Sequence, residues 1–244
     1  MSLISRLFSL GAASVMLAGL ASANLVDSYN LTSSYNDLLG GPSLTPNGGT
    51  LTPGTGYVFG VNTNGTGEGL SLSNSLLSNP GNYSIEMNFE IDTTSGFRKL
   101  VDTKNLTEDT QWYDINGHLQ YFNQPTGADV VFTPGTFVDL LVNRNSTTNE
   151  VKGYVNGVLE TDFIDTGGDA TFSGPNNIMW FFQDDNAFCG GCEVSSGTVK
   201  SIKIFDQPIT PTAAVPEPSM LWGLLAACGV TLLVKVRKIA SARS

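Results

Sequence analysis

The sequence predicts an all-β protein, a two-sheet antiparallel jelly-roll sandwich. Three observations predict it: residues 83–92 (YSIEMNFEID) alternate apolar and polar side chains, Asn-Gly pairs separate strand-like segments, and no long stretch shows a helical period. A body spanning residues 24–210 has the usual size of one such domain.

The clearest strand is 83–92. Side chains alternate across a strand, so its apolar residues would face the core and its polar residues the solvent. The apolar residues are Ile85, Met87, Phe89 and Ile91, and the polar ones are Glu86, Asn88, Glu90 and Asp92. A period of two over this length is typical of a half-buried strand rather than a helix.

Two tight hairpins are predicted at Asn116-Gly117 and Asn156-Gly157, because Asn-Gly supplies the positive φ angles of a type I′ turn. Further strands are expected at 136–142, 177–182 and 198–205. The first 60 residues of the body are rich in Gly, Ser, Thr and Asn, so their strand boundaries are not fixed by the pattern.

Residues 1–23 predict a signal peptide. Arg6 precedes an apolar run from Leu7 to Leu20, and Ala21-Ser22-Ala23 fits the small-residue cleavage pattern, so cleavage is expected after Ala23. A buried helix or a membrane anchor is the alternative, but the run is short for a membrane span and no stop-transfer charges follow it. The body is therefore expected to be exported.

The C-terminal end predicts a sorting segment in three parts. A linker at 211–219 contains Pro216-Glu217-Pro218, residues 220–234 form an apolar stretch expected to be a transmembrane helix, and residues 235–244 form a basic tail. The basic residues Lys235, Arg237 and Lys238 should stay cytoplasmic, which leaves the body outside.

This order of motif, apolar helix and basic tail resembles the PEP-CTERM sorting signal of Gram-negative bacteria. The resemblance implies an exosortase-type processing enzyme as a partner, cleavage near the motif, and release or attachment at the cell surface. It also implies a setting of biofilm and exopolysaccharide production. An ordinary single-span anchor after a proline-rich linker is the alternative.

Charge and composition exclude several functions. Five of the 12 basic residues and one of the 22 acidic residues lie outside 24–210, so the body carries seven basic and 21 acidic residues and a net charge of −14. Such a body lacks the basic face that nucleic acid requires. With one His and no Cys/His cluster, a tetrahedral zinc site or a His-based triad is hard to assemble.

The segment FVDLLVNRNSTTNEVKGYVNGVLETDF resembles the central hairpins of laminin-G-like, concanavalin A-like domains, and WYDINGHLQYF, MWFFQDDN and SSGTVKSIKIFD extend the match. The resemblance covers most of 83–206 and is looser over 24–80. It implies a two-sheet jelly roll whose N- and C-terminal strands are adjacent. Most families with this fold bind carbohydrate or protein, often beside calcium, and a minority are glycoside hydrolases.

Glu90-Ile91-Asp92 invites comparison with the Glu-x-Asp-x-x-Glu strand of jelly-roll glucanases, which places three acids on one face. Neither Thr94 nor Ser95, which follow Asp92, is acidic, so the third acid is missing. Glu86 lies four residues before Glu90, about 13 Å along an extended strand and too far for a retaining pair. The pattern favours an exposed polar face, and no catalytic residue is assigned.

Asp184 and Asp185 follow an apolar strand and precede Glu193. Carboxylate oxygens gathered at a loop are ligands that calcium prefers, so these three residues are the candidate metal site and calcium the one cofactor considered. No contiguous ligand loop is present, and a solvated acidic loop is the alternative.

Cys189 and Cys192 are the only cysteines of the body, and an exported chain favours a disulfide between them over a zinc or redox role. His118 has no partner in a recognisable motif and is interpreted as a strand residue. Aromatic residues flank its hairpin and are expected in the core or on the sheet surface, with a sugar platform as the alternative; these are Trp112, Tyr113, Tyr121 and Phe122.

The leading functional prediction is an exported, non-enzymatic domain that binds polysaccharide or another surface component at the cell surface or in the extracellular matrix. It would be held in the membrane by its C-terminal helix before processing. One alternative is a glycoside hydrolase of concanavalin A-like fold, and another is a purely structural matrix or envelope protein. The sequence does not separate binding from structural roles.

Overall fold

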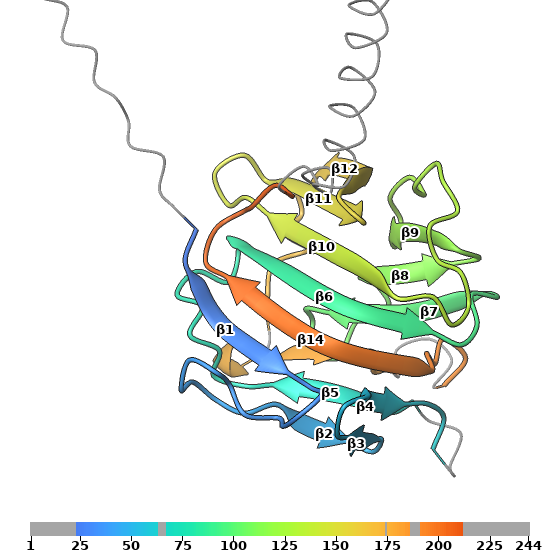
Figure 1. Cartoon of the computed structure of the whole chain (residues 1–244). Coiled ribbons are helices and arrows are strands. Elements are labelled where there is room, and N and C mark those ends of the chain that lie inside the picture. The colour runs from blue at the N-terminus through green and yellow to red at the C-terminus, as the bar shows by residue number, and fades with distance from the viewer. Residues whose placement is uncertain (1–22, 63–66, 174, 186–190, 212–244) are drawn as a thin grey trace, which may run out of the picture.

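The computed structural model describes residues 23–62, 67–173, 175–185 and 191–211. These residues form an all-β sandwich of two antiparallel sheets, as the sequence predicts, with a single turn of 3₁₀ helix at Pro175–Asn177 (Figure 1). The strands are β1 (Leu25–Asn30), β2 (Thr45–Asn47), β3 (Thr50–Thr52), β4 (Gly56–Phe59), β5 (Gly69–Leu72), β6 (Tyr83–Ile91), β7 (Phe97–Asp102), β8 (Trp112–Ile115), β9 (His118–Tyr121), β10 (Val138–Arg144), β11 (Glu150–Val155), β12 (Val158–Ile164), β13 (Met179–Phe181) and β14 (Gly197–Phe205).

One sheet has eight strands in the order β12-β11-β10-β6-β14-β4-β3, with β1 also paired to β14. The other has six strands in the order β2-β5-β13-β7-β8-β9. Non-consecutive neighbours such as β6 and β14 require long crossovers, as in a jelly roll. The two inner faces enclose one apolar core.

Strand β6 lies at the centre of the larger sheet, between β10 and β14. Its apolar residues Ile85, Met87, Phe89 and Ile91 are all buried in the core, which confirms the predicted alternation. The predicted strand ends one residue later than the observed one, at Asp92.

Both predicted hairpins are present. Asn116 and Gly117 have φ angles of 55° and 92°, and Asn156 and Gly157 have φ angles of 50° and 82°. Positive values at both central positions are those of the type I′ turn, whose twist matches the paired strands. Asn-Gly therefore fixes the β8–β9 and β11–β12 hairpins from local chemistry alone.

The end of β10 carries a buried ion pair. Arg144 Nε donates to Asp165 Oδ2 over 2.7 Å, and Nη1 donates to the Gly81 carbonyl over 2.7 Å. The Asp165 carboxylate also accepts the amides of Asp169 and Ala170. Several partners around each charge offset the cost of burying it.

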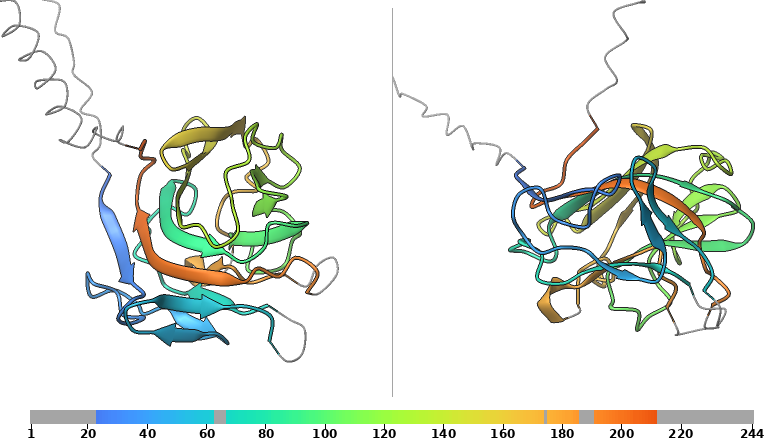
Figure 2. Two further views of the ribbon diagram at one scale, coloured as in Figure 1. Left: turned by 45° about the vertical axis from the view of Figure 1, so that its right-hand side comes forward. Right: turned by 60° about the horizontal axis from the view of Figure 1, so that its bottom comes forward.

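The two ends of the described chain meet at one edge of the sandwich, where β1 and β14 run side by side (Figure 2). The Asn24 amide donates to Asp206 Oδ1 over 2.8 Å, its side chain donates to Oδ2 over 2.8 Å, and the Asp206 amide donates to the Asn24 carbonyl. Adjacent terminal strands are what the laminin-G-like resemblance implies.

Several predictions concern residues outside the described part of the chain. These are the signal peptide up to Ser22, the sorting motif at Pro216, Glu217 and Pro218, the apolar stretch 220–234, and the basic residues Lys235, Arg237 and Lys238. Within the described residues no helix has the length and apolar character needed to cross a membrane.

Candidate functional site

The outer face of the six-stranded sheet gathers aromatic and charged side chains. Trp112 points into the core, so its neighbour Tyr113 points outward, and Trp180 points outward between two core residues of β13. Lys99 lies opposite Tyr113, and Asp102 lies opposite Trp180, which places all four on one face.

A β-bulge in β7 brings the two charged residues to this face. The register against β8 shifts between Lys99 and Val101, and both Leu100 and Val101 are buried in the core. The extra residue lets Lys99 and Asp102, three positions apart, share the outer side. Their charged atoms lie 3.7 Å apart.

Lys99 is fully buried and lies next to two carboxylates. Its Nζ donates to Asp185 Oδ2 over 2.5 Å, is 3.7 Å from Asp102 Oδ2, and lies 4.4 Å from the centre of the Tyr113 ring. An ammonium taken out of water needs such partners, and the ring face adds a cation–π contact.

Two further acids complete the group. Oxygens of Asp109, Asp185 and Glu193 all lie within 4.8 Å of one another, and the Tyr113 hydroxyl donates to Asp109 Oδ1 over 3.2 Å. Asp109 is half-buried, whereas Asp185 and Glu193 are buried. We call these six residues the Lys99 cluster: Lys99, Asp102, Asp109, Tyr113, Asp185 and Glu193.

Burial governs the electrostatics of this cluster. Desolvation raises the pKa of Glu193 to about 7, while Tyr113 and the Lys99 ammonium act in the opposite direction. Desolvation also raises the pKa of Asp102, and Lys99 again opposes the change. A carboxyl whose pKa is raised toward neutrality, beside carboxylates paired with an ammonium, is typical of a functional site.

The structure unites two of the three predicted metal ligands. Asp185 and Glu193 belong to the Lys99 cluster, whereas Asp184 Oδ2 accepts the backbone amides of Gly191 and Glu193 over 2.9 and 3.3 Å. Asp184 therefore holds the backbone of the loop at Gly191 and Glu193. Calcium at this place stays a prediction, and the ammonium of Lys99 competes with it for Asp185.

Sequence reasoning did not identify Lys99, Asp102, Asp109 or Trp180 as site residues. Lys99 lies in the segment FRKLVD, where the extra residue of the bulge breaks the alternation of inward and outward side chains. Asp109 lies in the long turn between β7 and β8. The sequence feature that could have pointed to Asp109 is the pair of acids in TEDTQWYDI, shortly before a strand that begins with two aromatic residues.

Cys192 is disulfide-bonded. Its predicted partner, Cys189, lies outside the described residues, so the pairing stays a prediction. Cys192 directly precedes Glu193, and a cross-link there would limit the freedom of the loop that supplies this acid.

The aromatic residues of the β8–β9 hairpin divide between core and surface. Trp112 and Tyr121 are buried in the core, and Tyr113 and Phe122 make edge-to-face contacts with Phe97, which is 37% exposed. The prediction of core or sheet surface is therefore correct. Phe97, Phe122 and the half-buried Trp180 give the outer face an accessible apolar component.

His118 lies at the start of β9 and is half-buried. Its Nδ1 is 3.0 Å from the carbonyl oxygen of Gly127, so the ring holds the loop after β9. This agrees with its interpretation as a strand residue.

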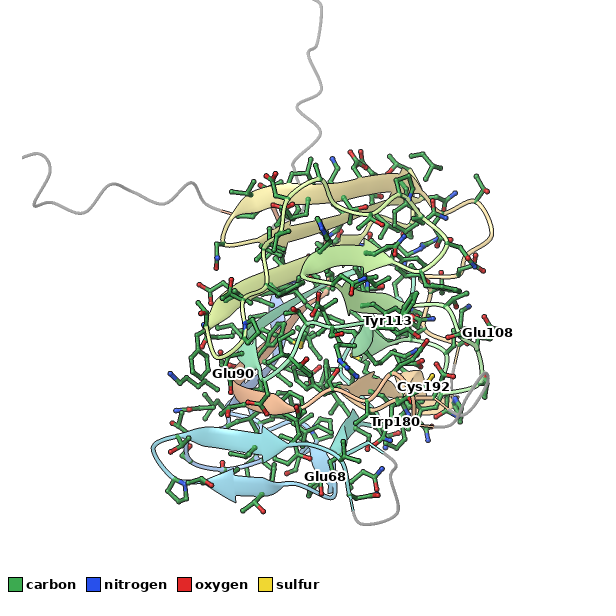
Figure 3. All side chains as sticks on the ribbon, turned by 90° about the vertical axis from the view of Figure 1, so that its right-hand side faces the viewer. Glu68, Glu90, Glu108, Tyr113, Trp180 and Cys192 are labelled. Carbon is green, nitrogen blue, oxygen red and sulfur yellow. The ribbon has the colours of Figure 1, made fainter. Side chains whose placement is uncertain are left out.

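Glu90 lies on the other sheet, on the side of the molecule away from Tyr113, Trp180 and Cys192 (Figure 3). It is buried beside Thr198, its register partner, and desolvation raises its pKa while Thr198 and Lys200 lower it. Glu86 pairs instead with Lys203, at 2.6 Å. The expected exposed polar face is therefore partly covered at Glu90.

A cavity of about 560 Å³ lies on the outer face of the eight-stranded sheet, away from the Lys99 cluster. Its described lining includes Glu86, Asp139, Asn156 and Ile209, without an aromatic side chain among the described residues. The cluster face combines buried charges, a carboxyl of raised pKa and partly exposed rings, so its chemistry makes it the stronger candidate site.

No protein-family model matches the chain, and no curated protein matches it. Solved structures show the same fold. Domain 4 of AbnA, an extracellular arabinanase of Geobacillus stearothermophilus in complex with arabinotriose, matches with a TM-score of 0.51 and 17% identity over 78% of this chain and 95% of that one. A Trypanosoma rangeli sialidase mutant with trans-sialidase activity matches with a TM-score of 0.56 and 13% identity over 76% of this chain.

A botulinum neurotoxin type C structure, whose cell entry depends on two ganglioside molecules, matches with a TM-score of 0.53 and 14% identity over 77% of this chain. The match spans 31% of the sialidase chain and 49% of the toxin chain. At these identities the likeness shows a shared β-sandwich fold.

These comparisons contradict one prediction. A protein without enzymatic activity was expected, because no complete catalytic strand was found in the sequence. Two of the similar structures belong to glycoside hydrolases, an arabinanase and a sialidase. The expectation that the chain is not an enzyme is therefore withdrawn, and the missing acid after Asp92 does not decide the question, because acids from the end of β7 and from the loops after β7 and β13 converge at the Lys99 cluster.

Proposed function

We propose that this protein recognises carbohydrate at the outer face of its six-stranded sheet. The observation that carries the proposal is the meeting, on one face, of the Lys99 cluster with the rings of Trp180, Phe97 and Phe122. Aromatic faces pack against the apolar faces of sugar rings, and carboxylates accept hydrogen bonds from sugar hydroxyls. Similar folds in carbohydrate-related proteins support this role.

Asp109 is the acid through which a ligand would reach the cluster, because it is half-buried while Asp185 and Glu193 are buried. The Trp180 indole donates to Asn105 Oδ1 over 3.2 Å, which fixes the ring next to the same long turn that carries Asp109. A fixed ring and a fixed carboxylate lower the ordering cost of binding.

A glycan-binding assay on the full chain, with calcium and with EDTA, tests the proposal. Binding of at least one glycan is expected, with a loss of about tenfold or more for Trp180→Ala or Asp109→Asn. Asp139→Asn, on the rim of the cavity on the other sheet, is the matched control and should leave binding unchanged. The proposal fails if no glycan binds, or if Asp139→Asn is the variant that abolishes binding.

Glycoside hydrolysis is the second candidate function, favoured by the carboxyls themselves. Retaining hydrolases hold two carboxyls about 5–5.5 Å apart, one of them protonated at neutral pH. Glu193, with a pKa raised to about 7, has its oxygen within 4.8 Å of Asp109. Asp109, the half-buried acid, would attack the sugar. Glu193 would first have to be uncovered by the substrate, and would then protonate the glycosidic oxygen and activate the water that releases the sugar.

Release of reducing sugar from arabinan, sialylated glycans and bacterial exopolysaccharides tests this second function. Glu193→Gln should lower the rate by a factor of about 10² or more, since it removes the proton donor. Glu90→Gln, on the opposite sheet, is the control. If Glu90→Gln abolishes release and Glu193→Gln does not, the activity resides on the other sheet.

We also propose export and sorting of the body, supported by the sequence of both ends. Mass spectrometry of the protein recovered from an exporting host should find an N-terminus at Asn24 and a new C-terminus near Pro216-Glu217-Pro218. A chain that keeps residues 235–244 would favour an ordinary anchor instead.

A further inference from the structure

Arg98 and Asp114 lie opposite each other on the inner side of the six-stranded sheet. They are register partners on β7 and β8, and Asp114 points to the same side as the core residue Trp112, two positions earlier. Asp114 is 0% exposed and Arg98 is half-buried. Directly opposite side chains of opposite charge usually interact. Among the described residues, however, Arg98 takes part in no ion pair, so the two groups are neighbours that the structure leaves unbonded.

Each of these two side chains has one bonded atom and one buried atom without a partner. Asp114 Oδ1 accepts the Gly117 amide over 2.6 Å, whereas Oδ2 has no hydrogen-bond partner among the described residues. Arg98 Nη1 donates to the Val194 carbonyl over 2.9 Å, whereas Nε has no such partner. A buried donor and a buried acceptor each cost free energy when they are unpaired. A hydrogen bond from Nε to Oδ2 would remove both costs at once.

The protonation state of Asp114 decides whether this hydrogen bond forms. Oδ1 already accepts the Gly117 amide, so a proton on the carboxyl belongs on Oδ2, where it meets the Nε–H of Arg98 as a second donor. Loss of that proton makes Oδ2 a charged acceptor for Nε. Burial raises the pKa of Asp114 to about 7, while the Gly117 amide and Arg98 act in the opposite direction. The change therefore falls near neutral pH.

Arg98 is the charged side chain that acts on Asp114. On β9 the register partner of Asp114 is the apolar Leu119, and His118 beside it points to the other side of the sheet. Asp129, in the segment that packs on the β8–β9 turn, acts on an acid of β12 instead. Across the core, β6 presents apolar side chains. The state of Asp114 is therefore transmitted through Arg98.

Arg98 connects Asp114 to the loop that supplies Glu193. Val194, whose carbonyl accepts the hydrogen bond from Arg98, directly follows Glu193. The Glu193 carbonyl accepts the amide of Lys99 over 3.0 Å, so the same loop is bound to β7 at the residue after Arg98. A shift of the guanidinium group therefore reaches an acid of the Lys99 cluster through one hydrogen bond.

We propose that Asp114 and Arg98 form a pH-dependent bridge that positions the loop carrying Glu193. When Asp114 is ionised, Arg98 Nε bonds to its Oδ2 while Nη1 stays on the Val194 carbonyl, and the loop is held against β7. When Asp114 is protonated, only the bond to Val194 remains. Both are positioning residues, because they act through the backbone next to Glu193. The effect on a ligand rests on the proposed function, but the bridge itself does not.

Nuclear magnetic resonance of the full chain, labelled with ¹⁵N-arginine, tests the bridge without any ligand. The Arg98 Nε–H signal should move as the pH rises from about 5.5 to 8.5, with a midpoint near 7, because Nε gains a charged acceptor. Asp114→Asn should abolish this movement. The Nε–H of Arg144 is the internal reference, because it is already bonded to Asp165 and its signal should stay constant.

Hydrogen exchange of the amides at 193–195 is the second measurement. Their protection, corrected for the intrinsic effect of pH on exchange, should rise about tenfold over the same range in the wild type. It should not rise in Arg98→Lys, which lacks Nε–H and gives the same test if Asp114→Asn does not fold. Glu193→Gln is the control and should keep the movement of the Arg98 signal.

An Arg98 signal that stays constant with pH would overturn the proposal. A signal that moves equally in Asp114→Asn would overturn it as well, because another group would then be titrating. Neither measurement contains a carbohydrate, so failure of the proposed function would leave both results unchanged.

Discussion

The Lys99 cluster and the Asp27 pair, which consists of the buried Asp27 on β1 and the buried Asp37 after it, both remove carboxylates from solvent, but only the first contains a basic side chain among the described residues. Lys99 Nζ contacts Asp185 and lies near Asp102, so an internal ammonium supplies the counter-charge. The Asp27 pair has amides and a hydroxyl, which donate hydrogen bonds without neutralising the charge. The comparison indicates that acidic clustering alone is a poor guide to metal sites, because a lysine from a distant strand removes the need for a cation.

Removal of the internal ammonium should have the largest effect. Lys99→Met leaves Asp102 and Asp185 without their buried counter-charge and should lower the free energy of unfolding by about 3–5 kcal/mol. Urea denaturation at pH 7.5 measures this loss. The loss should shrink as the pH falls, because burial raises the pKa of Asp102 and a protonated Asp102 no longer needs the ammonium.

Lys152→Met is the control for Lys99→Met, because Lys152 makes a partly exposed pair with Glu150 and should cost less than about 1 kcal/mol. Calcium should restore part of the stability lost in Lys99→Met if a cation and the ammonium are interchangeable. Equal losses in the two variants would contradict the role given to Lys99.

The protonation of Glu193 should appear in the pH dependence of stability. Its pKa is raised to about 7 in the fold, so the folded state binds the proton more tightly than the unfolded chain. Its contribution is complete below pH 4.5 and is lost as pH rises to 7, an effect of about 3 kcal/mol.

Unfolding in urea at a series of pH values measures this dependence in the wild type and in Glu193→Gln. The variant should lose less stability between pH 4.5 and 7, and should be the more stable of the two at pH 8. Glu86→Gln, a partly exposed control on the other sheet, should keep the wild-type dependence of the free energy of unfolding on pH. An unchanged slope in Glu193→Gln would show that the carboxyl is ionised throughout.

Filling the space beside Gly41 should affect the other acidic group. Gly41→Ala places a methyl group 2.7 Å from Asp37 Oδ2, and the crowding should cost about 1–2 kcal/mol. Urea denaturation at pH 7.5 measures this loss. Gly54→Ala is not a suitable control because Gly54 has a positive φ, whereas Gly60→Ala has room for a methyl and should keep the wild-type stability. A free energy of unfolding in Gly41→Ala equal to that of the wild type would contradict the crowding.

An exposed charge pair should have the smallest effect. Cleavage after Ala23 would turn the Asn24 amide, 2.8 Å from Asp206 Oδ1, into a charged amino group. The resulting pair is exposed to solvent and should stabilise the chain by less than about 1 kcal/mol. Comparison of the Tm of chains beginning at Asn24 and at Ala23 measures it, and Asp206→Asn should remove the difference.

Local sequence determined the parts of this protein that depend on neighbouring residues. Alternation in 83–92 predicted the central strand β6 and its buried face, and Asn116-Gly117 and Asn156-Gly157 predicted two hairpins, because side-chain direction and φ preference act within a few residues. The acids Asp185 and Glu193 were recognised by type and proximity in the sequence.

Tertiary structure alone decided which charges meet. Lys99 and Asp185 are 86 positions apart, and a bulge at Leu100 turns Lys99 to the outer face. Asp27 reaches Ser75 across 48 positions. Sheet order and register set these contacts, and they depend on how the whole core packs, so no local pattern reveals whether a buried acid finds an ammonium or leaves an oxygen without a partner.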